Sequence, residues 1–569
     1  MIKRLFKQML LTQILSSMTV MLCMLIDSIM IGRFLGVDSM TAYGFASPVL
    51  LVFAAVGNMV SAGVQVLCGK ALGSGDKKGS DACFSVSVFL TVLISAVGMS
   101  VVLLFTDQIC TLLGAGKPGP DNPVFDLTKD YLRGFIIGAP AFLSAQIMVP
   151  YMQISGQRLR LIIAVALMTA SDVIFDILTV IVFKGGTFGM GLASSLSYYI
   201  AFIIGVVYFF RKDCLFNFRA RLIKRRVCAN LLRDGLPTLV NQVSLVLLMY
   251  VLNQMLANVG GNHAVAAYSV ISTVGNICYS FGSGIASVAL MLSSIFYSDE
   301  DRSSLVSLVK TMTLFAVIIC GAVTVAVLLA AVPLVMLFLR EPDAKGMAIK
   351  GLRLFILSLV PCAINTNFKL FYQGIDRAWL TQIISVLQNF ALTALSAFIL
   401  SLFAGVDGIW LGFLFGEMLT LTVISVIVFV KAGTIKFSAE AYSLLPDDYG
   451  RSESLELTLN SRRDVDGAAE KAKEFCLKRG LSETQSDNVA DSISLIGGSI
   501  IENGFKSENG EQCIELRLIV KHGTPILRMR DNCARFNPFK YLKRAGKESV
   551  VSNAEYVDSL GLNNLKLIF

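Results

Sequence analysis

Histidine, tryptophan and charged residues are scarce in this chain. Of its 569 residues, two are histidines, two are tryptophans and 16% are charged. Because His263 and His522 are the whole supply, we do not expect a histidine-based metal site. The twelve cysteines contain no Cys-x-x-Cys pair, and none falls in a segment that we expect to lie outside the cell. A disulfide framework is therefore not expected either.

The low charge accompanies strong hydrophobicity. Hydrophobic residues make up 55% of the chain and the mean hydropathy is +0.69, which excludes a water-soluble globule for residues 1–433. Apolar stretches of the roughly 20 residues that cross a bilayer can be placed along this region. The predicted spans are 9–31, 41–67, 83–108, 131–153, 160–183, 188–210, 236–258, 264–295, 307–338, 350–373, 379–404 and 408–431. The predicted fold class is mostly α, a polytopic membrane protein with twelve transmembrane helices in two six-helix repeats.

The two halves of this region share a sequence repeat. Residues 36–49 (GVDSMTAYGFASPV) and 261–274 (GNHAVAAYSVISTV) align at a constant offset of 225 residues. The alignment pairs Gly36 with Gly261 and gives eight identities over 41 positions without a gap. Duplicated membrane halves are typical of transporters that rock one bundle of helices against the other. The repeat therefore predicts a transporter.

Basic residues gather in loops that we expect on one side of the membrane. Residues 211–226 contain seven Lys or Arg and one Asp, and MIKRLFK at the start, GDKKG at 75–79 and GQRLR at 156–160 fall on the same side. On the other side, residues 117–130 contain two lysines and three aspartates. The basic side is usually cytoplasmic, so both termini are predicted to be cytoplasmic at a plasma membrane. The net charge of +9 then reflects topology and anionic lipid, and nucleic acid is not an expected partner.

Hydropathy falls sharply after Val430, where a soluble region begins. We expect an N-terminal six-helix lobe at 1–215, a C-terminal six-helix lobe at 216–433, a linker at 434–451 and a small α/β domain at 452–569. In that domain SLELTLN alternates as a strand, two segments (464–480 and 484–504) have helical periodicity, and two strands flank a His-Gly turn. Its predicted core includes Leu516, Ile519, Ile526, Leu527 and Met529.

Three acidic residues lie inside apolar stretches of the first half. Asp27 is in the first predicted helix, and Asp172 and Asp176 are four residues apart on one face of the fifth. Acids at membrane depth are costly and face the bundle interior or a wet cavity. With no basic partner at similar depth, the three cannot all be ionised cheaply. Such a cluster suits a carrier that binds a proton or Na⁺ in one state and releases it in another, although single members could instead bond neighbouring helices.

Polar residues in the second half have a different character. They are Asn253, Gln254, Asn365, Asn367, Lys369, Gln388, Asn389 and Glu417. Most are interpreted as helix–helix hydrogen bonds, and Lys369 is expected to reach a helix end and snorkel. Candidates for contact with substrate are Gln65, Asn253, Asn367 and Gln388. The ion site is therefore expected in the first half alone.

Two prolines occupy corresponding positions in the fourth and tenth predicted helices. Pro140 follows GFIIGA, and Pro361 follows LFILSLV. Proline removes a backbone hydrogen bond and favours a bend. The sequence leaves open whether such bends move or are static.

These features together resemble the multidrug and toxic compound extrusion (MATE) family. The residues that carry the resemblance are DSIMIGRFLG at 27–36, GVQ…G…GSGD at 63–76, FDILTVIVF at 175–183 and GMGLASSLS at 189–197. The resemblance covers residues 1–433 and implies a V-shaped pair of six-helix lobes that exports cationic or amphipathic compounds in exchange for entering H⁺ or Na⁺.

The resemblance also assigns roles to individual residues. It places the family's first-helix acid on Asp27, its fifth-helix polar residue, often Asn, on Asp172, its fifth-helix acid on Asp176 and its sixth-helix hydroxyl near Ser197. The extra charge at Asp172 leaves the coupling ion and its stoichiometry open. No metal is implied beyond Na⁺ at these acids, and no cofactor is implied.

The C-terminal domain resembles the ATP-binding domain of histidine kinases and anti-sigma-factor kinases. The resemblance places an adenine-contacting Asp on Asp531 and a phosphate-side glycine near Gly561. It places the general base and the Mg²⁺ ligand on Leu495 and Ser499, which cannot do that chemistry. We therefore predict a degenerate domain without phosphoryl transfer, do not expect it to bind ATP, and expect it to contact a cytoplasmic protein.

The sequence thus favours a secondary antiporter with a regulatory domain, and not an enzyme. One alternative is a flippase for lipid-linked precursors, which a strongly cationic central cavity would favour. Another is a membrane-anchored signalling module that transports nothing, which the intact repeat and buried acids disfavour.

Overall fold

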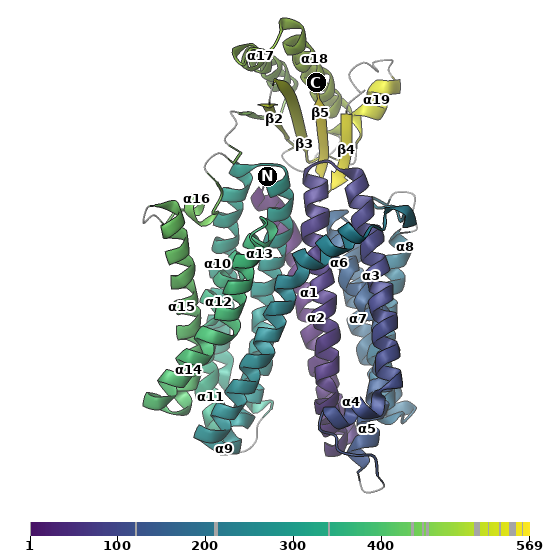
Figure 1. Cartoon of the computed structure of the whole chain (residues 1–569), viewed down its shortest axis with the longest axis vertical. Coiled ribbons are helices and arrows are strands. Elements are labelled where there is room, and N and C mark those ends of the chain that lie inside the picture. The colour runs from purple at the N-terminus through teal and green to yellow at the C-terminus, as the bar shows by residue number, and fades with distance from the viewer. Residues whose placement is uncertain are drawn as a thin grey trace.

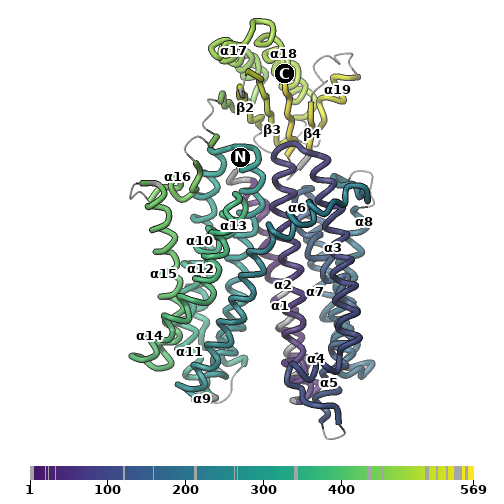
Figure 2. The backbone as a smooth tube through the Cα atoms, viewed as in Figure 1, coloured from purple at the N-terminus to yellow at the C-terminus, as the bar shows by residue number. Residues whose placement is uncertain are grey.

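Two helical bundles lie side by side, and a smaller domain that contains a sheet sits across one end of both (Figure 1). The computed structural model describes residues 2–119, 122–209, 214–338, 342–433, 437–446, 449–450, 454–505, 512–521, 523–533, 536–544, 554–559 and 562–569. We call the end that carries the C-terminal domain the domain end. The bundles lie close together there and diverge toward the opposite end, and both termini lie at the domain end (Figures 1 and 2).

The first bundle contains helices α1 to α8. Their bounds are α1 Ile2–Met30, α2 Val37–Gly73, α3 Lys77–Leu104, α4 Thr106–Leu112, α5 Pro123–Ile136, α6 Ala139–Ile154, α7 Arg158–Ile177 and α8 Gly186–Phe209. Short π-helical segments follow α1 (η1, Ile31–Leu35) and α7 (η2, Leu178–Val182). A 3₁₀ turn, η3 (Ala220–Leu222), precedes the second bundle.

The second bundle contains helices α9 to α15. Their bounds are α9 Arg225–Ser298, α10 Arg302–Met336, α11 Pro342–Ile356, α12 Leu359–Gly374, α13 Ala378–Val386, α14 Leu392–Ala404 and α15 Val406–Ala432, with a π-helical segment η4 (Leu387–Ala391) between α13 and α14. A short helix, α16 (Ala439–Tyr442), follows.

The predicted number of spans is confirmed. Among the described residues, ten helices are long and apolar enough to cross a membrane, and two bent pairs bring the number to as many as twelve. The bent pairs are α5 with α6, at 48°, and α11 with α12, at 46°. Pro140 and Pro361 lie at the second and third residues of α6 and α12, just after each break. The predicted bends are therefore present at equivalent positions of the two halves.

The repeat has a backbone explanation at its first pair of residues. Gly36 precedes α2 with a φ of 87°, and Gly261 interrupts α9 with a φ of 63°. Residues other than glycine rarely adopt a backbone conformation in this region of positive φ. Each glycine lets the chain turn from one span into the next, which explains why both halves keep glycine here.

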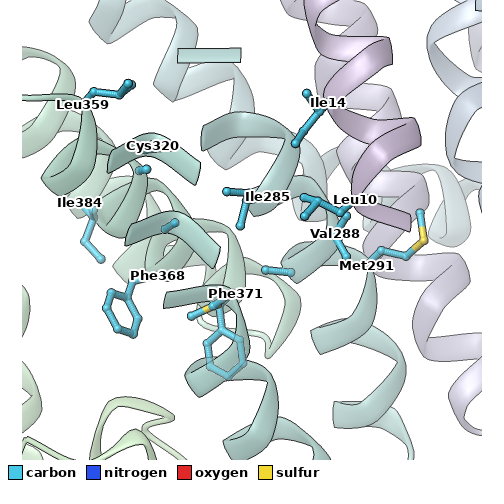
Figure 3. Close-up of a cluster of buried hydrophobic side chains, with 14 of the residues drawn as sticks. Leu10, Ile14, Ile285, Val288, Met291, Cys320, Leu359, Phe368, Phe371 and Ile384 are labelled. Atoms are coloured by element: carbon cyan, nitrogen blue, oxygen red, sulfur yellow. The ribbon is translucent and has the colours of Figure 1, made fainter. Parts of the chain in front are cut away.

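Close packing between α2 and α9 joins the bundles near the domain end. A side chain at Gly73 would collide with the carbonyl of Ile295. The approach lets Ser298 Oγ donate to the carbonyl oxygen of Lys70 at 2.6 Å. Leu10 and Ile14 of α1 also pack near apolar side chains of α9 such as Ile285, Val288 and Met291 (Figure 3).

The C-terminal domain is a five-stranded antiparallel sheet with helices on one face. The sheet order is β1-β2-β3-β5-β4, and the bounds are β1 Ser454–Leu459, β2 Ile514–Lys521, β3 Thr524–Asp531, β4 Ala554–Ser559 and β5 Leu562–Ile568. Helices α17 (Arg462–Lys478) and α18 (Glu483–Ser499) start at capping boxes on Ser461 and Ser482. A π-helical segment η5 (Ile500–Gly504) and helix α19 (Pro538–Arg544) complete the described elements.

The predicted core of this domain is partly wrong. Leu516, Leu527 and Met529 lie in the core under α17 and α18. Ile519 is 2% exposed but is not part of that core, and Ile526 is half-buried. In an antiparallel strand, successive side chains point to opposite faces. Both isoleucines lie on the face turned away from the helices, which covers the domain end of the bundles.

Candidate functional site

Three aspartates from two helices of the first bundle form a compact carboxylate cluster. Asp27 lies in α1, and Asp172 and Asp176 lie one turn apart in α7. A carboxylate oxygen of each lies within 4.8 Å of the others. The side chains are 6%, 2% and 0% exposed, respectively. The structure therefore brings together the three acids that the sequence singles out.

Hydrogen bonding around this cluster is incomplete. Ser194 Oγ, in α8, donates to Asp27 Oδ2 at 3.2 Å. Asp27 Oδ1, Asp172 Oδ2 and both carboxylate oxygens of Asp176 are buried with no hydrogen-bond partner among the described residues. Buried acceptors without donors are costly. The oxygen-rich cluster therefore fits a bound proton or a hard cation such as Na⁺, which prefers carboxylate ligands.

The serine that bonds Asp27 was not predicted. Ser197, the residue singled out by the sequence, donates to the carbonyl oxygen of Ser194 at 2.8 Å and lies beside Asp172 with Cys23. Ser194 lies one turn earlier and reaches Asp27 instead. The signal was the serine-rich stretch at 194–197, but sequence alignment alone cannot decide between hydroxyls one turn apart.

Buried polar side chains of the second bundle form a hydrogen-bonded network. Lys369 Nζ, in α12, donates to Asn241 Oδ1 at 2.5 Å and to Gln388 Oε1 at 2.9 Å. Gln388 Nε2 donates to Glu417 Oε2 at 3.1 Å, and Asn365 Nδ2 donates to the same oxygen at 2.7 Å. Four helical elements, α9, α12, η4 and α15, meet in this network. Its side chains bond one another, which fits the predicted role in helix–helix contact.

The predicted position of Lys369 is wrong. Its side chain is 4% exposed and lies inside the bundle instead of reaching toward a membrane surface. Asn241 accepts a hydrogen bond from this ammonium group and was not singled out by the sequence, although an asparagine in an apolar helix was a visible signal. The two amide partners, with Glu417 on the far side of Gln388, make burial of the ammonium group tolerable.

The candidate substrate contacts do not form one group. Gln388 is part of the network of Lys369, and Asn367 donates to the carbonyl oxygen of Met312 at 3.3 Å. Gln65 is buried in α2, whereas Asn253 is exposed on α9. A role in the substrate path therefore stays a prediction for all four.

The residues of the ATP-binding resemblance lie mostly in the core of the C-terminal domain. Asp531 is 0% exposed, and its Oδ1 accepts hydrogen bonds from Asn563 at 2.7 Å and from the backbone of Cys533 at 3.1 Å. Burial raises the pKa of Asp531 above its ordinary value, although these bonds oppose the shift. Ser499 is also buried, while Gly561 lies outside the described residues. The contacts give Asp531 a structural role at the end of β3.

Comparisons with known proteins agree on the membrane region. A sequence model of the MatE family matches residues 13–178 and 237–399. Multidrug export protein MepA of Staphylococcus aureus (strain MSSA476) is 22% identical over 393 residues, which are 68% of this chain and 85% of MepA. MepA of Staphylococcus saprophyticus is 21% identical over 401 residues, 70% of this chain and 87% of that protein.

Solved structures share the fold of the same region. A MATE transporter crystallised in complex with MaL6 superposes with a TM-score of 0.70 at 21% identity, over 74% of this chain and 94% of that chain. A transporter of the MOP superfamily from Pyrococcus furiosus, described as having a binding pocket of reverse polarity, superposes with a TM-score of 0.68 at 21% identity over the same shares. The fold of the bundles is therefore one that transporters use.

Proposed function

The chain belongs to the MatE family and is a multi-pass membrane transporter; on that premise we propose that it exports cationic or amphipathic small molecules in exchange for entering H⁺ or Na⁺. Its relatives include proteins described as multidrug export proteins, which supports this substrate class. Membership of the family leaves no place for the alternative of a signalling module that transports nothing.

The observation that carries the proposal is the cluster of Asp27, Asp172 and Asp176. Three buried carboxylates within 4.8 Å, with unbonded oxygens facing one another, hold strong affinity for one or more cations. A cation that binds there would weaken the repulsion among the carboxylates and would change how the helices around them pack. Release on the other side of the membrane would restore the repulsion. The cluster would therefore bind cation on one side of the membrane and release it on the other with each change of state, which is what coupling requires.

Two helical lobes, 1–215 and 216–433, would rock about their contact so that a central path opens to one side at a time. We place the domain end and both termini in the cytoplasm, because the basic loops gather there. The bundles diverge away from that end (Figure 1), toward the side that this topology would place outside the cell. Residues 434–451 would link the second lobe to a regulatory domain at 452–569 that contacts cytoplasmic proteins.

Purified protein in liposomes tests the proposal directly. We expect uptake or release of a fluorescent cationic dye only when a gradient of H⁺ or of Na⁺ is imposed, because the carboxylate cluster must be loaded on one side and emptied on the other. The four arms are each gradient alone, both gradients, and none. Equal dye movement in all four arms, with tight liposomes, would contradict an antiporter.

The two aspartates of α7 are expected to differ in importance. Asp176 is fully buried and neither of its oxygens has a described hydrogen-bond partner, whereas Asp172 lies beside Ser197 and Cys23. An amide at 172 can keep bonds to those neighbours, but an amide at 176 removes the least compensated charge. Asp176→Asn should therefore reduce gradient-driven export at least ten times more than Asp172→Asn, measured as initial rates in the same liposomes. The reverse ranking would mean that the ion binds nearer to Asp172.

A further inference from the structure

A row of five charged residues crosses the sheet of the C-terminal domain. In order across the strands they are Glu456, Arg517, Arg528, Lys566 and Glu555, each directly opposite the next in the sheet register. Three cations side by side on neighbouring strands repel one another. Burial and the nearby Arg530 lower the pKa of Arg528 to about 10, as expected for crowded cations. Glu456 lies 3.3 Å from Arg517 and Glu555 lies 3.5 Å from Lys566, so the central Arg528 has the greatest need of an anionic or hydrogen-bond-accepting partner outside the domain.

The second bundle supplies part of that partner at the end of α9. Arg528 Nη1 donates to the backbone carbonyl of Asp299 at 2.9 Å, and Arg517 Nη2 donates to that of Glu300 at 2.9 Å. Arg530 Nη2 lies 3.0 Å from Asp299 Oδ2. Carbonyl groups at a helix C-terminus carry partial negative charge, which favours cations. The arginines therefore bind the C-terminal end of α9 through the carboxylate of Asp299 and through the backbone carbonyl groups of Asp299 and Glu300.

The first bundle supplies the other part at the end of α2. Lys566 Nζ donates to the backbone carbonyl of Ser74 at 2.8 Å, and Ser74 is the residue that ends α2. Apolar contact continues beside this bond, because Val557 and Leu562 of the domain belong to the same buried cluster as Leu72 of α2. One sheet face therefore touches both bundles.

The two contacts fall on equivalent positions of the repeat. Ser74 and Asp299 are separated by the same 225 residues that align the two halves. Each is the C-terminal cap of its helix, and two residues later Asp76 and Asp301 are the N-terminal caps of the following helices α3 and α10. The domain thus binds the same helix end twice, once in each bundle.

The contact surface is largely polar and leaves a cavity beside the direct contacts. Arg517 is 9% exposed and Ile519 2% exposed on the face turned toward the bundles. Between the sheet and the helix ends lies a cavity of about 690 Å³, lined by residues such as Asp301, Ser304 and Glu515. Polar contacts of this kind between domains of one chain are compatible with separation.

We propose that this sheet face is a docking surface for the ends of α2 and α9, and that the docked domain holds the two bundles together at the domain end. The inference rests on the proposed function, because only a transporter that rocks its bundles has to open this end. Since the domain contacts both bundles, the bundles can separate at the domain end only after the sheet face dissociates from one of them. Release of the domain is therefore a point at which transport is controlled.

The test measures the separation of the bundles in the full chain. Spin labels at Lys78 of α3 and Lys310 of α10, both exposed, report the distance between them after the four half-buried cysteines are replaced. Arg528→Glu combined with Lys566→Glu reverses the charge of the residues that bind the ends of α9 and α2. The matched control, Arg463→Glu combined with Lys471→Glu, reverses an exposed arginine and lysine on α17, away from the contact.

We expect the contact variant to raise the ratio of open to closed distances about 5-fold or more, the size of a typical coupling between sites, with the control unchanged. High salt should shift the unmodified protein in the same direction but by less than the contact variant, because the pairs at this contact are largely buried and salt screens buried pairs less than exposed ones. That measurement needs no variant and remains informative if the contact variant folds poorly. Equal distances in the contact variant and the unmodified protein, or an equal shift in the control, would overturn the proposal. A protein that moves no dye in any gradient while these distances shift would defeat only the antiport function.

Discussion

Asp27→Asn is expected to abolish gradient-driven export, to the level of liposomes without protein. Asn keeps the shape of the side chain and the hydrogen bond from Ser194, which lies 3.2 Å from the carboxylate. It cannot take up a proton or balance the charge of Na⁺ beside Asp172 and Asp176. The cluster then loses the member contributed by α1, and with it the link between ion binding and the packing of α1 against α7.

The matched control is Asp38→Asn, the same substitution at an exposed position in the first turn of α2. It should leave export within about twofold of the unmodified protein, since surface substitutions usually change stability by less than about 0.5 kcal/mol. Both variants should be equally abundant and monodisperse. Unchanged export by Asp27→Asn under an imposed gradient would remove Asp27 from the coupling site.

The sequence predicted those parts of the fold that depend on hydropathy and on local backbone chemistry. Twelve apolar stretches are visible without a structure, because each must match the bilayer thickness. Gly36 and Gly261 could be paired because one backbone requirement, a positive φ, acts twice. Pro140 and Pro361 marked the bent spans for a similar reason. Each of these features depends on the type of one residue, so it can be predicted from the sequence.

Contacts between distant segments could not be predicted in this way. Asp172 and Asp176 share a helix face, but nothing in the sequence says that Asp27 of α1 lies against that face; the three acids were grouped by their shared position inside apolar helices and by the lack of a basic partner there. The end of the helix that contains Lys369 was predicted within one residue, at 373 against Gly374, but the sequence does not show which neighbours the lysine side chain faces. In the structure it is buried and bonded to Asn241, which lies 128 residues away.

The two bundles treat their buried polar groups in opposite ways. In the first bundle, four carboxylate oxygens of the cluster have no described hydrogen-bond partner. In the second, Gln388 joins Lys369 to Glu417, so a cation and an anion are held within one set of hydrogen bonds. A cluster with four unbonded oxygens can gain an ion, whereas a network in which most polar atoms are bonded, with Asn365 Oδ1 as an exception, resists change. The first bundle is therefore the one fitted for coupling, and the second bundle's network is fitted for fixing helices.

Breaking one side of that network should strongly destabilise the protein. Lys369→Met removes the only ammonium group in it and leaves Glu417, 6% exposed, without a compensating charge. Removal of one partner from a direct buried ion pair costs about 3–5 kcal/mol, which is an upper bound here because Gln388 lies between the two charges. We expect a marked fall in the thermal unfolding midpoint of the detergent-purified protein, and a similar fall for Glu417→Gln.

The combined variant, Lys369→Met with Glu417→Gln, should recover most of the lost stability, because neither buried charge is then left alone. The two losses should be non-additive by about 0.5–3 kcal/mol, the range of groups in one network. Lys310→Met, at an exposed lysine of α10, is the control and should leave the midpoint unchanged. If the effects of Lys369→Met and Glu417→Gln simply add, the two charges do not depend on each other. Since the network is interpreted as structural, the combined variant should also retain gradient-driven export, in contrast to Asp27→Asn.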